Sequence, residues 1–226
     1  MSYNSYCRSS TYTHQLAFIA LNLMPRKTRI TPRKLPQQDR SKMTVDAILT
    51  AAAHILTEDG YDTASTNHIA ERAGVSIGSL YQYFPNKEAI MTAVRERHTN
   101  EMAEIVESAV SQTAQQSLEA ALHELVKACI AAHRIDPNLH QVLHEQVPRL
   151  NQSSAEAKIL LLLREFLIQR HNEVQAQNLE LTVFILERTI ESLVHAAVIE
   201  YPKFLQENQL EKELTRLLLS FLSRQV

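Results

Sequence analysis

Apolar positions recur at helical spacing along most of the chain. Between residues 45 and 56 they fall three, four and seven residues apart, which is the pattern of an amphipathic helix with one buried face. Four prolines after residue 80 stand between long stretches of this kind and are read as stops. Strand and hairpin patterns are absent. The sequence therefore predicts an all-α fold.

The three glycines of the chain are confined to positions 60, 74 and 78. Phosphate-binding glycine loops of the Walker or Rossmann type need several closely spaced glycines, so neither is predicted. Gly60 is suited to end the first helix in a left-handed cap. Gly74 is suited to close a second, short helix that begins at Ser65 or Thr66. Ser76 then caps a third helix, and two short helices joined by a tight turn make a helix-turn-helix.

The third helix has the composition of a recognition helix for the major groove of DNA. Small residues at its start let the backbone approach DNA closely: Ser76, Gly78 and Ser79. Tyr81 and Tyr83 are two residues apart, so they cannot both share the buried side of this helix with Leu80 and Phe84. We expect outward tyrosine hydroxyls to bind phosphates. Lys87, at the start of a fourth helix capped by Asn86, is expected to contact a second phosphate.

Basic charge is concentrated at the N-terminus. Residues 1–42 contain eight Lys or Arg and one Asp, a net charge of +7, so the remainder of a chain with net charge -2 carries -9. Prolines interrupt this segment, which indicates a flexible basic arm that reaches DNA, although a solvated linker without function is the alternative. The stretch MPRKTRI at Met24 looks like a natural start, so residues 1–23 are expected to be dispensable or mis-assigned.

Residues 48–90 resemble the DNA-binding domain of the tetracycline-repressor (TetR) family. The resemblance is carried by ILTAAAHILTEDGYDTAS and NHIAERAGVSIGSLYQYFPNKEAI. It implies that Thr66 touches phosphate and that Asn67 reaches a base or a phosphate. The side facing DNA would be formed by Ile77, Gly78, Ser79, Tyr81, Gln82, Tyr83 and Lys87. Many relatives have a polar residue that reads a base at the position of Ile77. The apolar side chain of Ile77 can make a base contact only with the methyl group of thymine.

The same resemblance divides the chain into the arm, a three-helix helix-turn-helix domain at 43–90 and a helical effector-binding and dimerisation domain at 91–226. The sequence of this last region contains apolar stripes at helical spacing. One of them, in the final helix, is formed by Leu210, Leu214, Leu217, Leu218 and Phe221. The last two helices are expected to form a homodimer interface, which would set two reading heads about 34 Å apart. The alternative is that both helices complete the core of a monomer.

An effector site is expected between the helices at 118–133 and 159–170. Its predicted lining is Leu122, Val126, Leu162 and Phe166. Apolar side chains outnumber polar ones in these helices, which favours an apolar or amphipathic organic ligand over a sugar phosphate or a metal.

Reactive side chains give weaker signals. His140 and His144 are four residues apart on one predicted helix face, but no third ligand is spaced to join them, so no metal site is predicted. Glu191 and His195 are expected to form an intrahelical pair. Cys129 has apolar neighbours and is interpreted as a small buried residue rather than a sensor thiol. No cofactor motif is present, and no enzyme activity is predicted.

The sequence thus predicts a cytoplasmic transcriptional regulator without a membrane segment. We expect a dimeric repressor that binds pseudo-palindromic double-stranded operator DNA and is released by a small-molecule effector. The alternative is a DNA-bound structural or localisation factor that has no small-molecule ligand.

Overall fold

The computed structural model describes residues 39–148 and 154–223, and these residues form the predicted all-α fold. The first seven helices in chain order are α2 (Asp39–Asp59), α3 (Thr66–Arg72), α4 (Ile77–Tyr83), α5 (Lys87–Gln112), α6 (Leu118–His133), α7 (Pro137–Glu145) and α8 (Ser154–Gln169). They are followed by α9 (Leu179–Ile199), the 3-10 helix η1 (Pro202–Asn208) and α10 (Gln209–Leu222). No helix within the described ranges combines the length and the apolar character needed to span a membrane.

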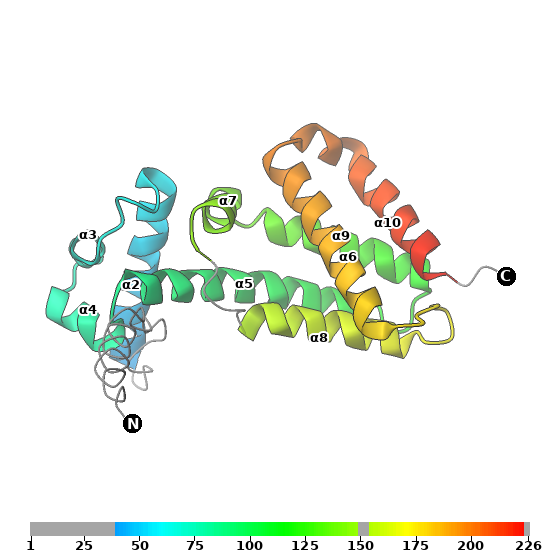
Figure 1. Cartoon of the computed structure of the whole chain (residues 1–226), viewed down its shortest axis with the longest axis horizontal. Coiled ribbons are helices and arrows are strands. Elements are labelled where there is room, and N and C mark those ends of the chain that lie inside the picture. The colour runs from blue at the N-terminus through cyan, green and yellow to red at the C-terminus, as the bar shows by residue number, and fades with distance from the viewer. Residues whose placement is uncertain (1–38, 149–153, 224–226) are drawn as a thin grey trace, which may run out of the picture.

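The reading head consists of α2, α3 and α4 at one end of the molecule (Figure 1). Its boundaries follow the predicted local signals. Gly60 and Gly74 adopt left-handed backbone angles, with φ of 81° and 67°; Gly60 directly follows α2, and Gly74 follows the C-cap residue of α3. The Ser65 hydroxyl accepts a hydrogen bond from the backbone N–H of His68, and the Ser76 hydroxyl accepts one from that of Ser79. These caps fix the helix-turn-helix.

Helix α5 joins the reading head to the rest of the chain without a break. Asn86 caps it, accepting a hydrogen bond from the backbone N–H of Ala89 at 2.8 Å. Its 26 residues correspond to about 39 Å of helix, so it runs along much of the long axis (Figure 1). The predicted domain boundary at residue 90 therefore falls inside a continuous helix. The predicted end of the arm at residue 42 falls inside α2, and residues 1–38 lie outside the described part.

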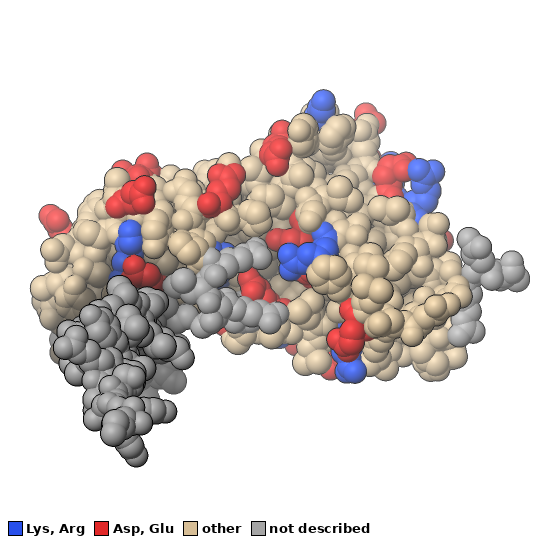
Figure 2. Space-filling view, in the orientation of Figure 1, with Lys and Arg blue, Asp and Glu red and all other residues tan. Residues whose placement is uncertain are grey.

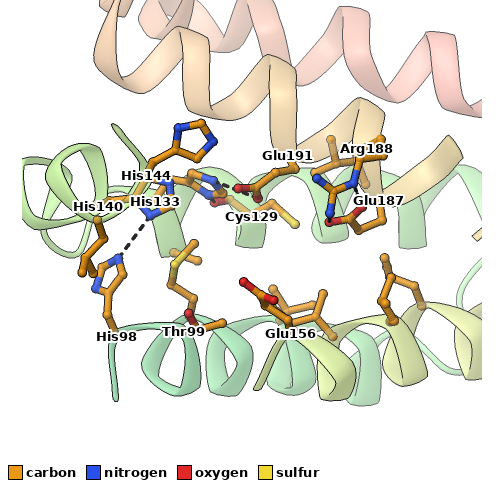
Figure 3. A pocket seen from close by; sticks show the side chains of 18 of the residues that line it. His98, Thr99, Cys129, His133, His140, His144, Glu156, Glu187, Arg188 and Glu191 are labelled. Atoms are coloured by element: carbon orange, nitrogen blue, oxygen red, sulfur yellow. Dashed lines mark hydrogen bonds and ion pairs between the residues drawn. The ribbon is translucent and has the colours of Figure 1, made fainter. Parts of the chain in front are cut away.

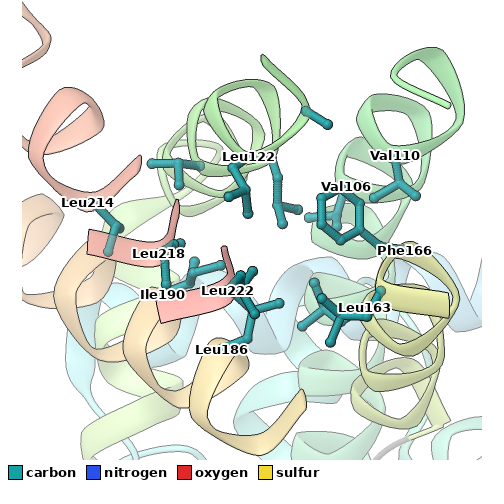
Figure 4. Packing of buried hydrophobic residues seen from close by; sticks show 14 of the residues in the cluster. Val106, Val110, Leu122, Leu163, Phe166, Leu186, Ile190, Leu214, Leu218 and Leu222 are labelled. Atoms are coloured by element: carbon teal, nitrogen blue, oxygen red, sulfur yellow. The ribbon is translucent and has the colours of Figure 1, made fainter. Parts of the chain in front are cut away.

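Two hydrophobic clusters stabilise the molecule. The head cluster contains Ile48, Leu49, Ala52, Ile55, Leu56, Ala64, Ile69, Ala70, Leu80, Tyr83, Phe84, Ala89, Ile90, Met91, Val94, Leu139, Leu143 and Val147. The bundle cluster contains Val106, Val110, Leu118, Ala121, Leu122, Leu125, Val126, Ile130, Leu163, Phe166, Leu167, Val174, Val183, Leu186, Ile190, Val194, Leu214, Leu218 and Leu222. Figure 4 shows how the second cluster joins α5, α6, α8, α9 and α10. Helix α5 contributes to both clusters.

Candidate functional site

The outer surface of α3 and α4 gathers most of the residues predicted to face DNA. Asn67, Ser76, Ile77, Gly78 and Gln82 are exposed, and Ile77 keeps 38% of its surface open to solvent. The start of α4 is held in shape by its own serines, because the hydroxyls of Ser76 and Ser79 lie 2.8 Å apart. Small groups therefore surround the backbone at Gly78, as close approach to DNA requires.

Thr66 and Tyr81 connect the two helices of this surface. The Thr66 hydroxyl and the Tyr81 hydroxyl lie 3.1 Å apart, within hydrogen-bond distance. Tyr81 is 40% exposed, so its ring lies along the surface while its hydroxyl stays near the start of α3. Two hydroxyls at one point, beside a helix N-terminus, offer a phosphate both donors and a favourable dipole.

Tyr83 and Lys87 lie differently from the prediction. Tyr83 is 8% exposed and belongs to the head cluster, so Tyr81 is the tyrosine that faces outward. The reason is the helical period, because residue 83 follows Leu80 by three positions and shares its side of α4. The ammonium group of Lys87 donates to the backbone carbonyl of Tyr61 at 3.0 Å and lies 3.9 Å from the centre of the Tyr61 ring. Lys87 is thus anchored inside the reading head, rather than extended as a phosphate clamp.

Cations are scarce on this surface. Helix α4 contains no charged residue, and Arg72 of α3 is paired with Glu58 of α2 through contacts of 2.5 and 2.8 Å. In Figure 2 the surface over α3 and α4 carries few Lys or Arg side chains on the face shown. The described part of the reading head therefore offers shape and hydrogen-bond donors to DNA more than positive charge.

A second site is a cavity of about 130 Å³ enclosed by α5, α6, α7, α8 and α9. Its apolar lining includes Met102, Val106, Cys129, Leu143, Ile159, Leu160, Leu163 and Ile190. Its polar lining includes Arg95, His98, Thr99, His133, His140, His144, Glu156, Glu187, Arg188 and Glu191. Figure 3 shows the imidazoles at one end, with Arg188 and Glu187 at the other. The cavity therefore has amphipathic walls.

The histidines form a chain across four helices. His98 Nε2 lies 3.2 Å from His140 Nδ1, and His140 Nε2 lies 3.0 Å from His195 Nδ1. The rings of His133 and His140 meet edge to face at 4.6 Å, and the rings of His144 and His195 are 4.3 Å apart. The expected pair of Glu191 with His195 is replaced by contacts to other helices, since Glu191 Oε2 lies 3.3 Å from His133 Nε2.

Burial controls the protonation of this group. Burial, together with the neighbouring His133, lowers the pKa of His140 to about 3. Burial also lowers the pKa of His98 and of His195. For Glu191 burial acts in the opposite direction, but its contact with His133 and the nearby imidazoles outweighs it and brings the pKa to about 2. At neutral pH the imidazoles of His98, His140 and His195 are therefore neutral, beside the ionised carboxylate of Glu191.

The surroundings of Cys129 agree with its interpretation as an unreactive residue. Its thiol borders the cavity, and burial raises its pKa to about 12, so the reactive thiolate is not formed near neutral pH. Its backbone carbonyl has a separate role, because it lies 2.9 Å from His133 Nδ1.

Two family models match the chain, one ending inside α5 and the other beginning after it. Residues 48–94 match the model for bacterial regulatory proteins of the tetR family, and residues 117–222 match the model for the tetracyclin repressor-like C-terminal domain. The chain belongs to the TetR family. The two models together cover about two thirds of its length and include the reading head, the bundle and most of the cavity wall.

Individual relatives of this TetR-family chain match different parts of it. The transcriptional activator FasR of Mycolicibacterium smegmatis is 35% identical over 80 residues, or 35% of each chain. The nucleoid occlusion factor SlmA of Mannheimia succiniciproducens is 25% identical over 63% of this chain and 67% of that protein. The solved structure of the fatty acid degradation regulator FadR from Bacillus halodurans is 26% identical, with a TM-score of 0.57 over 78% of this chain and 94% of that one. The match to FasR thus spans about a third of that relative.

The predicted effector-lining residues of this TetR-family chain do not border the cavity. Leu122, Val126 and Phe166 are fully buried in the bundle cluster, and Leu162 is half-buried outside the cavity wall (Figure 4). The two predicted helices, α6 and α8, do line the cavity, but through other faces. About half of the side chains in its wall are polar, whereas most of its surface is apolar.

Sequence reasoning missed several residues of the cavity wall. His98, His133 and Arg95 lie on faces of α5 and α6 that are otherwise apolar, and each of the three is buried. A buried charged or titratable residue on an apolar face was the available signal, because such groups are costly without partners. Apart from the contacts of His133 with Cys129 and His140, the partners lie more than 40 positions away and give no local pattern.

Proposed function

We propose that this TetR-family chain is a dimeric, ligand-responsive repressor. Its reading heads bind the two half-sites of a pseudo-palindromic operator through α3 and α4. A small amphipathic molecule in the cavity between α5 and α9 releases the operator. The proposal assigns no catalytic step to the cavity.

The observation that carries this proposal is the position of α7. Leu139 and Leu143 of α7 belong to the head cluster, while His140 and His144 of the same helix line the cavity. One short helix thus contacts the reading head on one side and the ligand space on the other (Figure 1). A displacement of α7 caused by a ligand would be transmitted directly to α2 through packed side chains.

Polar contacts attach α7 firmly to its surroundings. Arg95 of α5 donates hydrogen bonds to the carbonyls of Leu143 and Val147, both at 2.6 Å. Gln146, just after α7, accepts a hydrogen bond from the backbone N–H of Tyr61 at 3.1 Å. The cavity volume of about 130 Å³ is below the ~300–1,000 Å³ typical of ligand sites. A larger ligand would therefore separate the surrounding helices, and α7 would have to move.

The expected dimer surface is the outer side of α9 and α10. Leu214, Leu218 and Leu222 of α10 are buried in the bundle cluster, so one stripe of this helix completes the core of its own chain. A second row remains exposed: Leu193 on α9, with Leu217 and Phe221 on α10, while Leu181 and Phe184 are exposed on other sides of α9. Exposed apolar residues in such number are typical of an interaction surface. A two-fold contact between two such surfaces would place two reading heads on one operator.

Fatty acids and their thioesters are the first ligand class to test. The amphipathic cavity wall fits a molecule with an apolar chain and a polar end. The likeness to FadR, a fatty acid degradation regulator, extends over 78% of this chain and so includes the bundle.

The test begins with selection of an operator from genomic DNA fragments by the purified full chain. Fatty acids of increasing chain length and their coenzyme A thioesters are then titrated against the protein with and without that operator. A true inducer weakens operator binding, and by reciprocity the operator weakens inducer binding by the same factor. If the affinity for each of these compounds is the same with and without the operator, ligand-responsive repression by this class is contradicted.

A DNA-bound structural or localisation factor is the second candidate. The match to the nucleoid occlusion factor SlmA covers more of the chain than the match to FasR. This candidate predicts many dispersed chromosomal sites and no ligand-dependent release. Mapping bound sites across the chromosome separates it from a repressor, which would occupy few sites near promoters.

Gly78→Ala is expected to impair DNA binding without harming the fold. A Cβ built at Gly78 meets Ser76 Oγ at 3.9 Å, an ordinary contact, and alanine in a helix is favoured over glycine by about 0.5–1 kcal/mol. A methyl group between the backbone and DNA should nevertheless cost about 1–3 kcal/mol of operator binding, as a mismatched base pair does. Thermal melting and operator titration measure the two effects.

Gly74→Ala is the matched comparison for Gly78→Ala. It places the same methyl group in open space but at φ of 67°, so we expect a loss of stability of about 1–2 kcal/mol. Operator binding by Gly78→Ala equal to that of the unmodified chain would place the DNA surface elsewhere.

Removal of the basic arm is expected to weaken binding to operator and to random DNA alike. Because α3 and α4 carry few cations, residues 26–34 would supply much of the phosphate contact, with five Lys or Arg. A chain starting at Asp39 should show a smaller slope of log K against log salt, by about one for each cation that contacts a phosphate. A chain starting at Met24 should bind as the full chain does. An equal loss in both truncated chains would contradict this division of the arm.

A further inference from the structure

Three donor side chains from three helices converge at the histidine end of the cavity. They are His133 of α6, His140 of α7 and Glu191 of α9, and one ligand atom from each lies within 4.8 Å of the others. Two of these side chains are buried and the third is partly buried. Their spacing in the sequence, at 133, 140 and 191, matches no metal-binding motif, so the sequence pattern indicated only the pair His140 and His144.

The environment of His133 leaves one nitrogen directed at this point without a hydrogen bond. Its Nδ1 lies 2.9 Å from the Cys129 carbonyl, which can only accept, so Nδ1 carries the proton. Its Nε2 is buried, is not aligned for a hydrogen bond with any described group, and lies 3.3 Å from Glu191 Oε2. With Nδ1 as the donor, the lone pair on Nε2 is directed at the Glu191 carboxylate, which is also an acceptor. A cation between these two acceptors would satisfy both.

The contacts of His133 match those of histidine ligands in metalloproteins. A metal-bound histidine usually donates its other ring N–H to a carbonyl or carboxylate, which fixes the ring and strengthens the ligand. The Cys129 carbonyl has this position for His133. For His140, each ring nitrogen lies near another imidazole nitrogen, at 3.2 Å for His98 and 3.0 Å for His195. Whichever nitrogen of His140 bound an ion, a neighbour would be available to accept the proton of the other.

One separation is also that of a small coordination site. Bonds of 2.0–2.1 Å to a tetrahedral Zn²⁺ place neighbouring ligand atoms about 3.3 Å apart. The contact between His133 Nε2 and Glu191 Oε2 is 3.3 Å. The widest separation among the three donors, up to 4.8 Å, would close with a modest rotation of side chains.

We propose that His133, His140 and Glu191 bind a divalent transition-metal ion, for which Zn²⁺ is the best match. Two imidazoles and one carboxylate form a common ligand set for Zn²⁺ and its first-row neighbours, and not for Mg²⁺ or Ca²⁺, which prefer oxygen. All three side chains line the cavity, so a position left open by three protein ligands faces the cavity. The proposal does not depend on the operator or on the class of organic effector.

The test uses the full chain without an affinity tag, stripped of metal by a chelator. Zn²⁺ is titrated in the presence of a chelating indicator of moderate affinity, so that weak surface histidines do not contribute. We expect one Zn²⁺ per chain. His133→Gln and Glu191→Gln should each lower the affinity for Zn²⁺ by about tenfold or more, since changes to outer-shell partners alone already cost ~10–100-fold. Mg²⁺ should not compete.

His171→Gln is the matched control, because His171 is an exposed histidine just after α8. Its affinity for Zn²⁺ should equal that of the unmodified chain. The visible spectrum of Co²⁺ added to the unmodified chain gives a second reading that needs no variant, because coordination by four or five ligands intensifies the bands of the hydrated ion. A hydrated-ion spectrum, failure to retain Zn²⁺ against the indicator, or equal affinity in all variants would overturn the proposal.

Discussion

The double variant Leu217→Glu/Phe221→Glu is expected to be a folded monomer that has lost most of its operator affinity. Both side chains lie in the exposed row, beside the buried stripe of α10 that contains Leu214 and Leu218. Two carboxylates per chain would have to be desolvated, unpaired, in a two-fold contact. Two linked half-site contacts bind ~10²–10⁴-fold more tightly than one, and a monomer forfeits this gain. Light scattering and operator titration measure the two losses.

Leu161→Glu is the matched control for this variant. Leu161 of α8 is 52% exposed, as Leu217 is, but it lies outside the row on α9 and α10. It should leave both the dimer and the operator affinity unchanged. A double variant that remains dimeric, with unchanged helical content by circular dichroism, would reject the last two helices as the interface.

The reading head was predictable because the ends of its helices are determined by residues close to them in the sequence. Ser65, Ser76 and Asn86 cap the helices that follow them, and left-handed glycines follow α2 and α3. These interactions span three or four positions, so sequence spacing determines them. Helical spacing also predicts that Tyr83 is buried, because it lies three residues after the buried Leu80. The prediction that Tyr83 faces DNA, as Tyr81 does, followed from its residue type instead.

The cavity could not be predicted in the same way. Leu122 and Phe166 lie on helices with broad apolar surfaces, and periodicity does not distinguish a side chain that borders a cavity from one that fills the core. The difference depends on which neighbouring helix leaves space, and that is set by packing. For the histidines the limit is separation in sequence: His98 and His140 lie 3.2 Å apart in space and 42 positions apart in the chain.

Helix α10 shows why its sequence left both expectations for the last helices open. Its apolar stripe was predicted as one face. In the structure Leu214 and Leu218 complete the core of the chain, while Leu217 and Phe221 remain outside. A helix that is apolar over so wide an arc has residues for both a core and an interaction surface. The spacing of apolar residues in the sequence does not show which of them are buried.

Arg95→Met is expected to destabilise the protein by about 3 kcal/mol and to loosen α7 in particular. The buried guanidinium donates to the carbonyls of Leu143 and Val147 at 2.6 Å each. Methionine fills similar space but leaves both carbonyls without this donor, and each such loss costs about 1–3 kcal/mol. For a chain of this length the melting temperature should fall by ~6–12 °C. Hydrogen exchange should rise over residues 137–147 more than over α9.

Arg97→Met separates this effect from the loss of a positive charge on α5. Arg97 lies two positions further along the helix and donates to the Thr50 hydroxyl at 3.2 Å in an exposed contact. Its replacement should change stability by no more than about 0.5 kcal/mol, as is usual for surface positions. Equal melting temperatures for the two variants would mean that the contacts of Arg95 do not anchor α7. Uniform exchange across all helices in Arg95→Met would mean that α7 does not open independently of the remainder, and α7 would then be a poor candidate for the element that transmits ligand binding to the reading head.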